Sequence, residues 1–233
     1  MADPLELSID TASEMASVAL SRQGQLLAEI TWRCRRNHSV ELLPTIDKLL
    51  NHVGADKQEL AAVFVCLGPG LYTGLRVGVS TAKGLAYALA LPAVGVGRLE
   101  LDAYTHAAYG GPIVPVHAAG RGELAWAVYE GQGDGLREVT PPRLSLPADL
   151  VRQAPRAALF CGEVSVELAQ AIGRGLPRAR IAPAAAGRRA AHLAALAYRR
   201  LAAGTAVDPA ALKPIYLREA AMAPKPFATP GPT

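Results

Sequence analysis

The first hundred residues alternate between short apolar runs and turn residues. Residues 5–10 (LELSID), 16–22 (ASVALSR) and 25–32 (QLLAEITW) have the length of strands, and Gln23-Gly24 separates the last two. This spacing predicts three strands joined by tight turns in an antiparallel meander. Residues 61–68 (AAVFVCLG) form a continuous apolar run, which is typical of a strand buried on both faces.

Helices are predicted on both sides of that buried strand. In residues 40–53 apolar side chains recur at helical spacing, and Gly54 is a stop signal. The apolar residues that share one face of this helix are Val40, Leu43, Ile46, Leu50 and Val53. A second helix over about residues 73–90 leads to a strand at 92–97. The order β-β-β-α-β-α-β describes one complete mixed α/β unit, which ends near residue 100.

The second half of the chain also places strand pairs before its helices. After a helix at 98–109 and a break at YGGP, strands are predicted at 113–119, 124–130, 136–140 and 157–162. Residues 141–147 (PPRLSLP) are predicted to be a loop, with helices near 165–172 and 188–203. The pattern predicts two related α/β lobes. The proline-rich residues 220–233 predict a disordered tail.

Composition narrows the class of protein. The chain has 233 residues, of which 51% are hydrophobic and 19% charged, as in ordinary globular proteins. Three cysteines argue against a disulfide framework, and no apolar run approaches the roughly 20 residues of a membrane span. The N-terminal residues lack the pattern of a signal peptide, so we expect a cytoplasmic protein. The net charge of +4 is scattered, and nucleic-acid contact through Arg33, Arg35 and Arg36 stays open.

Three glycines lie inside the helix predicted at 73–90, where each costs ~0.5–1 kcal/mol relative to alanine. Small residues recur there every four positions, at Gly74, Gly78, Ala82, Ala86 and Ala90. We call the first four of these the small-residue ridge. Such a ridge lets another backbone approach closely, and Val77, Thr81 and Leu85 flank it with apolar groups. The periodicity leaves open whether the protein's own sheet or another molecule packs there.

Candidate catalytic groups are few. Asp10 and Thr11 close the first predicted strand, where α/β proteins place ligand-facing groups, although an aspartate there more often caps a turn. The Gly68-Pro69-Gly70 turn can bind an anion at a helix N-terminus, yet the spacing of a P-loop is missing. No histidine pair has metal-site spacing, and no nucleophile motif occurs.

Four segments resemble, in this order and spacing, the bacterial TsaB (YeaZ) family. They are LSIDTASEMASVAL, RNHSVELLPTIDKLL, GPGLYTGLRVGVSTAKGLAYALALPAVGVGRLELDA and PIYLRE. The match is dense over residues 7–103 and resumes at 214–218. The resemblance implies a two-lobed α/β fold of the actin/Hsp70/sugar-kinase (ASKHA, RNase H-like) type, in which each lobe is a mixed sheet flanked by helices. It implies a first lobe at 1–105, a second at 106–207 and a C-terminal segment, 208–219, that returns to the first lobe.

The resemblance also implies a function. It is that of a non-catalytic scaffold subunit in the transfer of threonylcarbamoyl to N6 of the adenosine beside the anticodon, in tRNAs that read codons starting with A. The implied partners are the catalytic paralogue TsaD, the ATPase TsaE and a second copy of the chain, with tRNA bound only through the complex. No cofactor, metal or catalytic residue is expected.

The family's association surface implies docking through the helices at about 38–53 and 73–90. The implied interface residues are Gly74, Gly78, Ala82, Ala86, Val77, Thr81, Leu85, His38 and Leu42. The small-residue ridge would then face a partner. Gly78→Leu is accordingly expected to leave the monomer folded and to abolish association.

Two other functions compete with this one. An ATP-dependent small-molecule kinase of the same fold would use Asp10 and the Gly68-Pro69-Gly70 turn. Against it, relatives often have Asp-Ala-Arg where this chain has Ala118, Ala119 and Gly120. A peptidase would need a nucleophile motif or a pair of histidines with metal-site spacing, and this sequence has neither.

Overall fold

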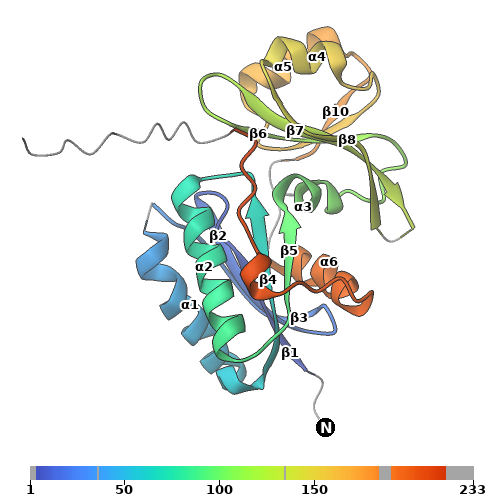
Figure 1. Cartoon of the computed structure of the whole chain (residues 1–233). Helices are drawn as coiled ribbons and strands as arrows, with labels where there is room; N and C mark the ends of the chain where they lie inside the picture. Colours follow the sequence, from blue (N-terminus) through green and yellow to red (C-terminus); the bar gives the residue numbers. More distant parts are fainter. Residues whose placement is uncertain (1–3, 36, 134, 184–189, 219–233) are drawn as a thin grey trace, which may run out of the picture.

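Two five-stranded mixed sheets with the same strand order build the protein (Figure 1). The structure, a computed structural model, describes residues 4–35, 37–133, 135–183 and 190–218, so the tail predicted at 220–233 lies outside the described residues. The first sheet has the order β3-β2-β1-β4-β5. Its strands are β1 (Leu5–Asp10), β2 (Met15–Arg22), β3 (Gln25–Arg33), β4 (Leu60–Gly68) and β5 (Ala93–Gly97). The first three strands are antiparallel, which confirms the predicted meander, and β1, β4 and β5 are parallel, with β4 the strand predicted to be buried.

The second sheet has the order β8-β7-β6-β9-β10, which matches the first sheet strand for strand. Its strands are β6 (Ile113–Ala118), β7 (Leu124–Gln132), β8 (Gly135–Ser145), β9 (Leu159–Gly162) and β10 (Arg180–Ile181). The loop predicted at 141–147 is wrong, because β8 continues through Pro141 and Pro142 to Ser145. Both prolines are tolerated since β8 is an edge strand, which leaves one side of its backbone unpaired.

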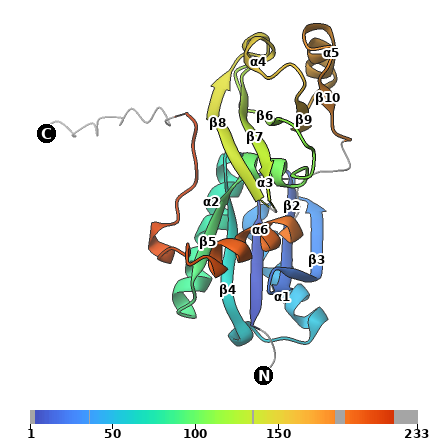
Figure 2. The same ribbon diagram turned by 90° about the vertical axis from the view of Figure 1, so that its right-hand side faces the viewer.

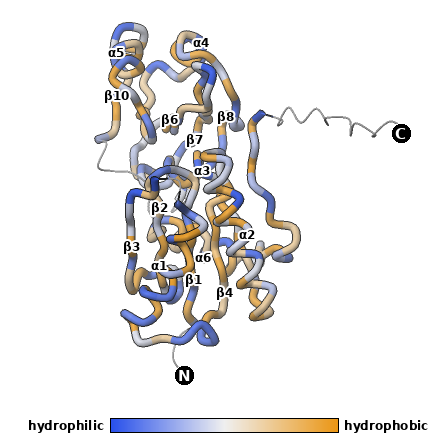
Figure 3. Tube along the Cα trace, turned by 90° about the vertical axis from the view of Figure 1, so that its left-hand side faces the viewer, coloured by the Kyte–Doolittle hydropathy of each residue, from blue (hydrophilic) through white to orange (hydrophobic). Residues whose placement is uncertain are grey.

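The helices cover both faces of each sheet. They are α1 (His38–Val53), α2 (Tyr72–Ala88), α3 (Arg98–Tyr104), α4 (Pro147–Gln153), α5 (Val166–Gly175) and α6 (Ala190–Ala202), with short 3-10 helices at Lys57–Glu59 and Pro209–Ala211. Helix α4 is not predicted from the sequence, where its first residue belongs to the proline-rich segment 141–147. Strand β4 shows the layering: Val63 and Val65 belong to the core under α1 and α2, whereas Phe64 packs with α6 on the opposite face. Hydrophobic positions accordingly concentrate in the central strands of the first sheet (Figure 3).

The last helix of each βαβ series packs against the sheet of the other lobe. On α3, Leu99 and Ala103 share a core with Tyr129 of the second sheet. On α6, Leu193 shares a core with Phe64 of the first sheet, and Figure 2 shows α6 lying across that sheet. From the sequence, the second lobe is expected to span residues 106–207. In the structure α6 lies within that range but packs against the first sheet. Periodicity in a sequence reports that a helix has an apolar face, and not which sheet that face meets.

The buried face of α1 also differs from the prediction. Ile46 and Leu50 are buried as expected, but Val40 is 71% exposed and Leu43 is 55% exposed. The core instead receives the side chains of His38, Leu42 and Leu49. Apolar residues lie on two faces of this helix, so its sequence does not distinguish the face that meets the sheet.

Candidate functional site

The ends of β1 and β4 meet the start of α2 in a tightly packed turn region. Asp10 Oδ1 accepts a hydrogen bond from the backbone N–H of Ala12 at 3.0 Å, so this buried carboxylate caps its own turn. The hydroxyl of Thr11 donates to the carbonyl oxygen of Gly74 at 2.8 Å, and the N–H of Leu71 donates to the carbonyl oxygen of Ala12 at 2.9 Å. These bonds fix the start of α2 against the end of β1.

The small-residue ridge faces inward, so its assignment to a partner interface is wrong. Gly74, Gly78, Ala82 and Ala86 are all buried in the chain itself. A Cβ on Gly74 would overlap the carbonyl oxygen of Thr11, and a Cβ on Gly78 would overlap the Thr11 hydroxyl. The ridge therefore exists so that α2 can approach the end of β1, which is the internal alternative that the periodicity left open.

His38 and Leu42 are also buried and cannot contact a partner directly. Leu42 belongs to the core of the first sheet. The Nε2 atom of His38 lies 3.2 Å from the carbonyl oxygen of Ser13, and Nδ1 has no hydrogen-bond partner among the described residues. Of the expected interface residues, Val77, Thr81 and Leu85 are half-buried and reach the surface of α2.

A different set of residues forms the outer face of α1 and α2. Val40 and Leu43 are exposed on α1, and Tyr87 is 85% exposed on α2. Gly84 lies on the exposed side of α2, and a Cβ added there would meet no atom of the described residues within 4 Å. A groove of about 430 Å³ lies along α1, with Leu43 in its wall, and is completed by Lys57, Leu60 and, on α2, Leu85. We call Val40, Leu43, Gly84, Leu85 and Tyr87 the outer helical face.

A larger cavity of about 820 Å³ lies between the two lobes. Its wall includes the β1–β2 turn (13–15), the β4–α2 turn (69–72), the end of β6 with the residues after it (117–120), Glu163 and the C-terminal residues 215–218. From the sequence, the β4–α2 turn is a candidate anion site, and residues 118–120 replace the Asp-Ala-Arg that relatives often have. The structure brings these two segments to the same cavity.

Each arginine in the cavity wall is paired with a glutamate. Arg33 pairs with Glu14 at 3.1 Å, Arg98 with Glu163, and Arg218 with Glu123. Arg98 is the buried member, with 3% of its side chain exposed, and its Nε also lies 3.7 Å from Asp102 Oδ2. Arg98 and Glu163 come from different lobes and are 65 residues apart, so no local pattern could have found the pair. Among the described residues, no three metal-ligating side chains gather at one place.

The C-terminal segment closes one side of this cavity. Ile215 N–H donates to the Leu67 carbonyl oxygen at 2.8 Å, and the ring of Tyr216 lies 5.5 Å from that of Tyr72. Burial, with the neighbouring Tyr72 hydroxyl second, raises the pKa of Tyr216. The Arg218–Glu123 pair then joins this segment to the second lobe. Residues 208–218 thus connect the two lobes along α2, as the red segment of Figure 1 shows.

The cysteines are unsuited to nucleophilic chemistry. Cys34, Cys66 and Cys161 are all buried free thiols. Burial, followed by a hydrogen bond with Glu41, raises the pKa of Cys34 to about 11. Burial also raises the pKa of Cys161 well above its ordinary value. At neutral pH both side chains are therefore protonated, and a thiol is a poor nucleophile compared with a thiolate.

Comparisons with known proteins give consistent matches. A family model described as "TsaD: tRNA N6-adenosine threonylcarbamoyltransferase" matches residues 26–221. The "tRNA threonylcarbamoyladenosine biosynthesis protein TsaB" of Bacillus subtilis is 35% identical over 159 residues, which cover 67% of this chain and 69% of that protein. The protein of the same name from Escherichia coli is 34% identical over 132 residues, which cover 56% of this chain and 57% of that protein.

Solved structures agree with the sequence matches. A Pseudomonas aeruginosa protein described as similar to peptidase YEAZ superposes with a TM-score of 0.80 at 25% identity, covering 92% of this chain and 99% of that one. A ROK family protein from Streptococcus pneumoniae superposes with a TM-score of 0.50 at 9% identity, which shows the fold alone.

The two mixed sheets have one strand order, each receives a helix from the other half of the chain, and a cavity lies at their junction. These features define a two-lobed α/β protein of the actin/Hsp70/sugar-kinase class. Within that class, the chain belongs to the TsaB (YeaZ) family. No helix in the described part of the chain is long and apolar enough to cross a membrane.

Proposed function

We propose that this chain is a non-catalytic subunit in the synthesis of threonylcarbamoyladenosine in tRNA, and that it docks through its outer helical face. The family to which it belongs supports the pathway, since its named members are tRNA threonylcarbamoyladenosine biosynthesis proteins. The docking partner is the catalytic paralogue TsaD or, in its absence, a second copy of the chain. TsaE and tRNA join through that complex, and the modified nucleoside is the adenosine beside the anticodon in tRNAs that read codons starting with A.

The observation that carries the docking proposal is the exposed state of the outer helical face. Val40 and Leu43 place apolar surface in water although α1 already buries a separate core face. Gly84 costs the helix ~0.5–1 kcal/mol relative to alanine, and no contact with another residue that the structure describes explains it. Exposed apolar side chains on α1 and an exposed glycine on the neighbouring α2 suit close packing of another helix.

The kinase alternative has less support from the cavity. A nucleotide phosphate needs uncompensated cations or free backbone N–H groups, and each arginine of the wall already pairs with a glutamate. The Asp10 carboxylate caps the turn that follows β1.

The docking proposal is tested by adding bulk at Gly84. Gly84→Leu should abolish the dimer, measured by light scattering, and weaken co-purification with TsaD, while the unfolding transition stays at least as stable as in the wild type. Gly173→Leu is the matched control, because Gly173 is also an exposed glycine inside a helix with nothing within 4 Å of an added Cβ. A Gly84→Leu protein that associates like the control would remove the outer helical face from the interface.

A further inference from the structure

Two turns of the second lobe lie side by side at one edge of its sheet. After α4 the chain turns through residues 154–158 into β9, and after α5 it turns through residues 176–179 into β10. The two strands are parallel, with Arg180 opposite Leu159, and the N–H of Arg180 donates to the carbonyl oxygen of Ala158 at 2.9 Å. Residues that precede both strands are therefore neighbours.

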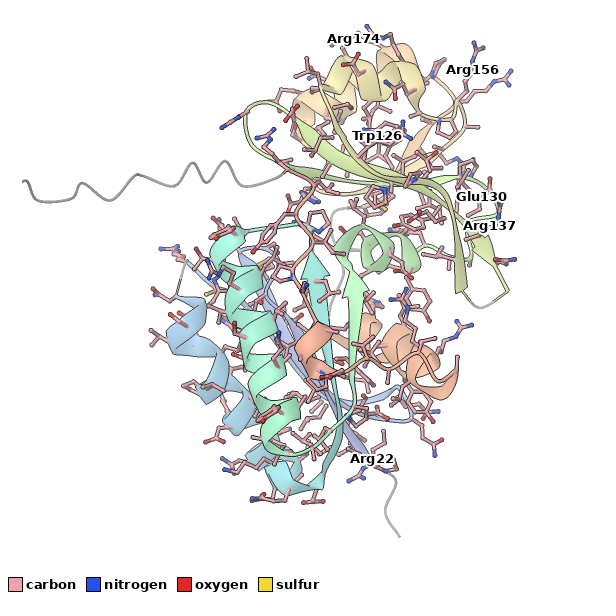
Figure 4. The ribbon with its side chains drawn as sticks, viewed as in Figure 1. Arg22, Trp126, Glu130, Arg137, Arg156 and Arg174 are labelled. Atoms are coloured by element: carbon pink, nitrogen blue, oxygen red, sulfur yellow. The ribbon has the colours of Figure 1, made fainter. Side chains whose placement is uncertain are left out.

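The two helices also end together. A Cβ on Gly175, the last residue of α5, would overlap the side chain of Val151 near the end of α4. Their sequence neighbours Arg174 and Arg152 belong to the last turns of these two helices. With the two turns, this geometry gathers exposed arginines that we call the arginine corner: Arg152, Arg156, Arg174, Arg178 and Arg180. Figure 4 shows Arg156 and Arg174 at the end of the second lobe that is farther from the first.

Among the described residues, one of these five arginines forms an ion pair. Arg152 pairs with Asp149, but the other four arginines form no ion pair with any described residue. Arg152 and Arg174 occupy the last turns of α4 and α5, where a cation stabilises the helix dipole. That structural role does not extend to Arg156 and Arg178, which lie beyond the helix ends in the two turns.

We propose that the arginine corner binds the phosphate backbone of RNA, an inference that rests on the proposed function in tRNA modification. Guanidinium groups match phosphate geometry and are weakly hydrated, which makes arginine well suited to phosphate contacts. The corner lies on the α4 and α5 layer, whereas the outer helical face lies on α1 and α2 at the other lobe (Figure 1). Docking of a protein partner on α1 and α2 therefore leaves the corner free for the tRNA.

The experiment measures tRNA binding by the complex of this chain with its catalytic paralogue, over a salt series of about 0.05 to 0.2 M. Arg156→Gln with Arg178→Gln should weaken binding at least roughly fivefold and lower the slope of log affinity against log salt by roughly 1.5 to 2. Arg22→Gln with Lys213→Gln removes the same charge elsewhere and is the control; Figure 4 shows Arg22 at the opposite end of the molecule. Formation of the complex, measured by light scattering, should be unchanged in both double variants.

Each other outcome would overturn either this inference alone or the proposed function as well. Equal weakening by the two double variants would reduce the effect to net charge, and unchanged binding would remove the corner from the RNA contact. If polyglutamate displaces tRNA as effectively as an unrelated RNA of equal charge does, the corner would bind an acidic protein and not RNA. If the wild-type complex forms but neither binds nor modifies tRNA, the proposed function fails along with the inference. If it modifies tRNA and the arginine variant does so with wild-type affinity, only the inference fails.

Discussion

The hydroxyl of Thr11 occupies the space that a side chain at Gly78 would need. The same hydroxyl donates a 2.8 Å hydrogen bond to the carbonyl oxygen of Gly74, one turn earlier in α2. The end of β1 and the first half of α2 are therefore in backbone contact, which a larger residue at either glycine would prevent. This relationship explains two of the three glycines in the helix, whereas Gly84 has no such contact with a described residue.

Gly78→Leu should destabilise the monomer, contrary to the expectation from the sequence. Its side chain collides with Thr11 in a close-packed region, and overpacking of this kind costs ~1–3 kcal/mol of unfolding free energy. Gly84→Ala should instead raise that free energy by ~0.5–1 kcal/mol, because the added methyl group meets open space. Chemical unfolding followed by circular dichroism measures both. Equal stabilities for the two variants would contradict the packing of α2 on β1.

The buried Arg98 should contribute more to the free energy of unfolding than its partner Glu163. Arg98→Met removes a cation that lies beside the buried Asp102 carboxylate, and breaking a buried pair costs ~3–5 kcal/mol. Glu163→Gln should cost ~1 kcal/mol or less, since 49% of the Glu163 side chain is exposed to solvent, which screens its charge. Unfolding titrations of the two variants give the comparison, and a larger loss for Glu163→Gln would reverse our assignment.

Thiol reagents should not modify the folded protein at mildly alkaline pH. The pKa of Cys34 is raised to about 11 by burial, so its thiolate forms only when the pH approaches that value. Cys66 and Cys161 are buried as well. Ellman's reagent should detect three thiols after denaturation in guanidinium and none promptly before it. Rapid modification of Cys34 in the native protein would show that the turn after β3 opens.

Protonation of His106 should destabilise the fold in mild acid. Burial, and then the nearby charge of His192, lowers the pKa of His106 below 6.5 in the folded state. The unfolded chain therefore binds more protons between the two pKa values, so stability falls as the pH drops through 6.5 toward the folded pKa. His106→Gln should show a smaller difference in unfolding free energy between about pH 8 and about pH 5 than the wild type. An undiminished difference would assign the acid sensitivity to other groups.

Local sequence signals were sufficient for most of the elements. The meander of β1 to β3, the buried strand β4 and helix α2 follow from runs of apolar residues whose length and period are set within each segment. The family motifs added the fold class. The second half of β8 and helix α4 were not predicted, because prolines in the segment 141–147 signal a loop unless the strand is known to lie at an edge.

The direction of each face was decided by tertiary packing. By itself, the sequence determined that α2 carries a ridge of small residues and that α1 carries apolar residues at Val40, Leu43 and Ile46. Only the fold decided that the ridge meets Thr11 and that Val40 and Leu43 face water. The physical reason is that helical periodicity gives the angle between side chains around one axis, whereas burial depends on which other segment lies against each side. For Arg98 and Glu163, 65 residues apart, that information exists only once both lobes are folded.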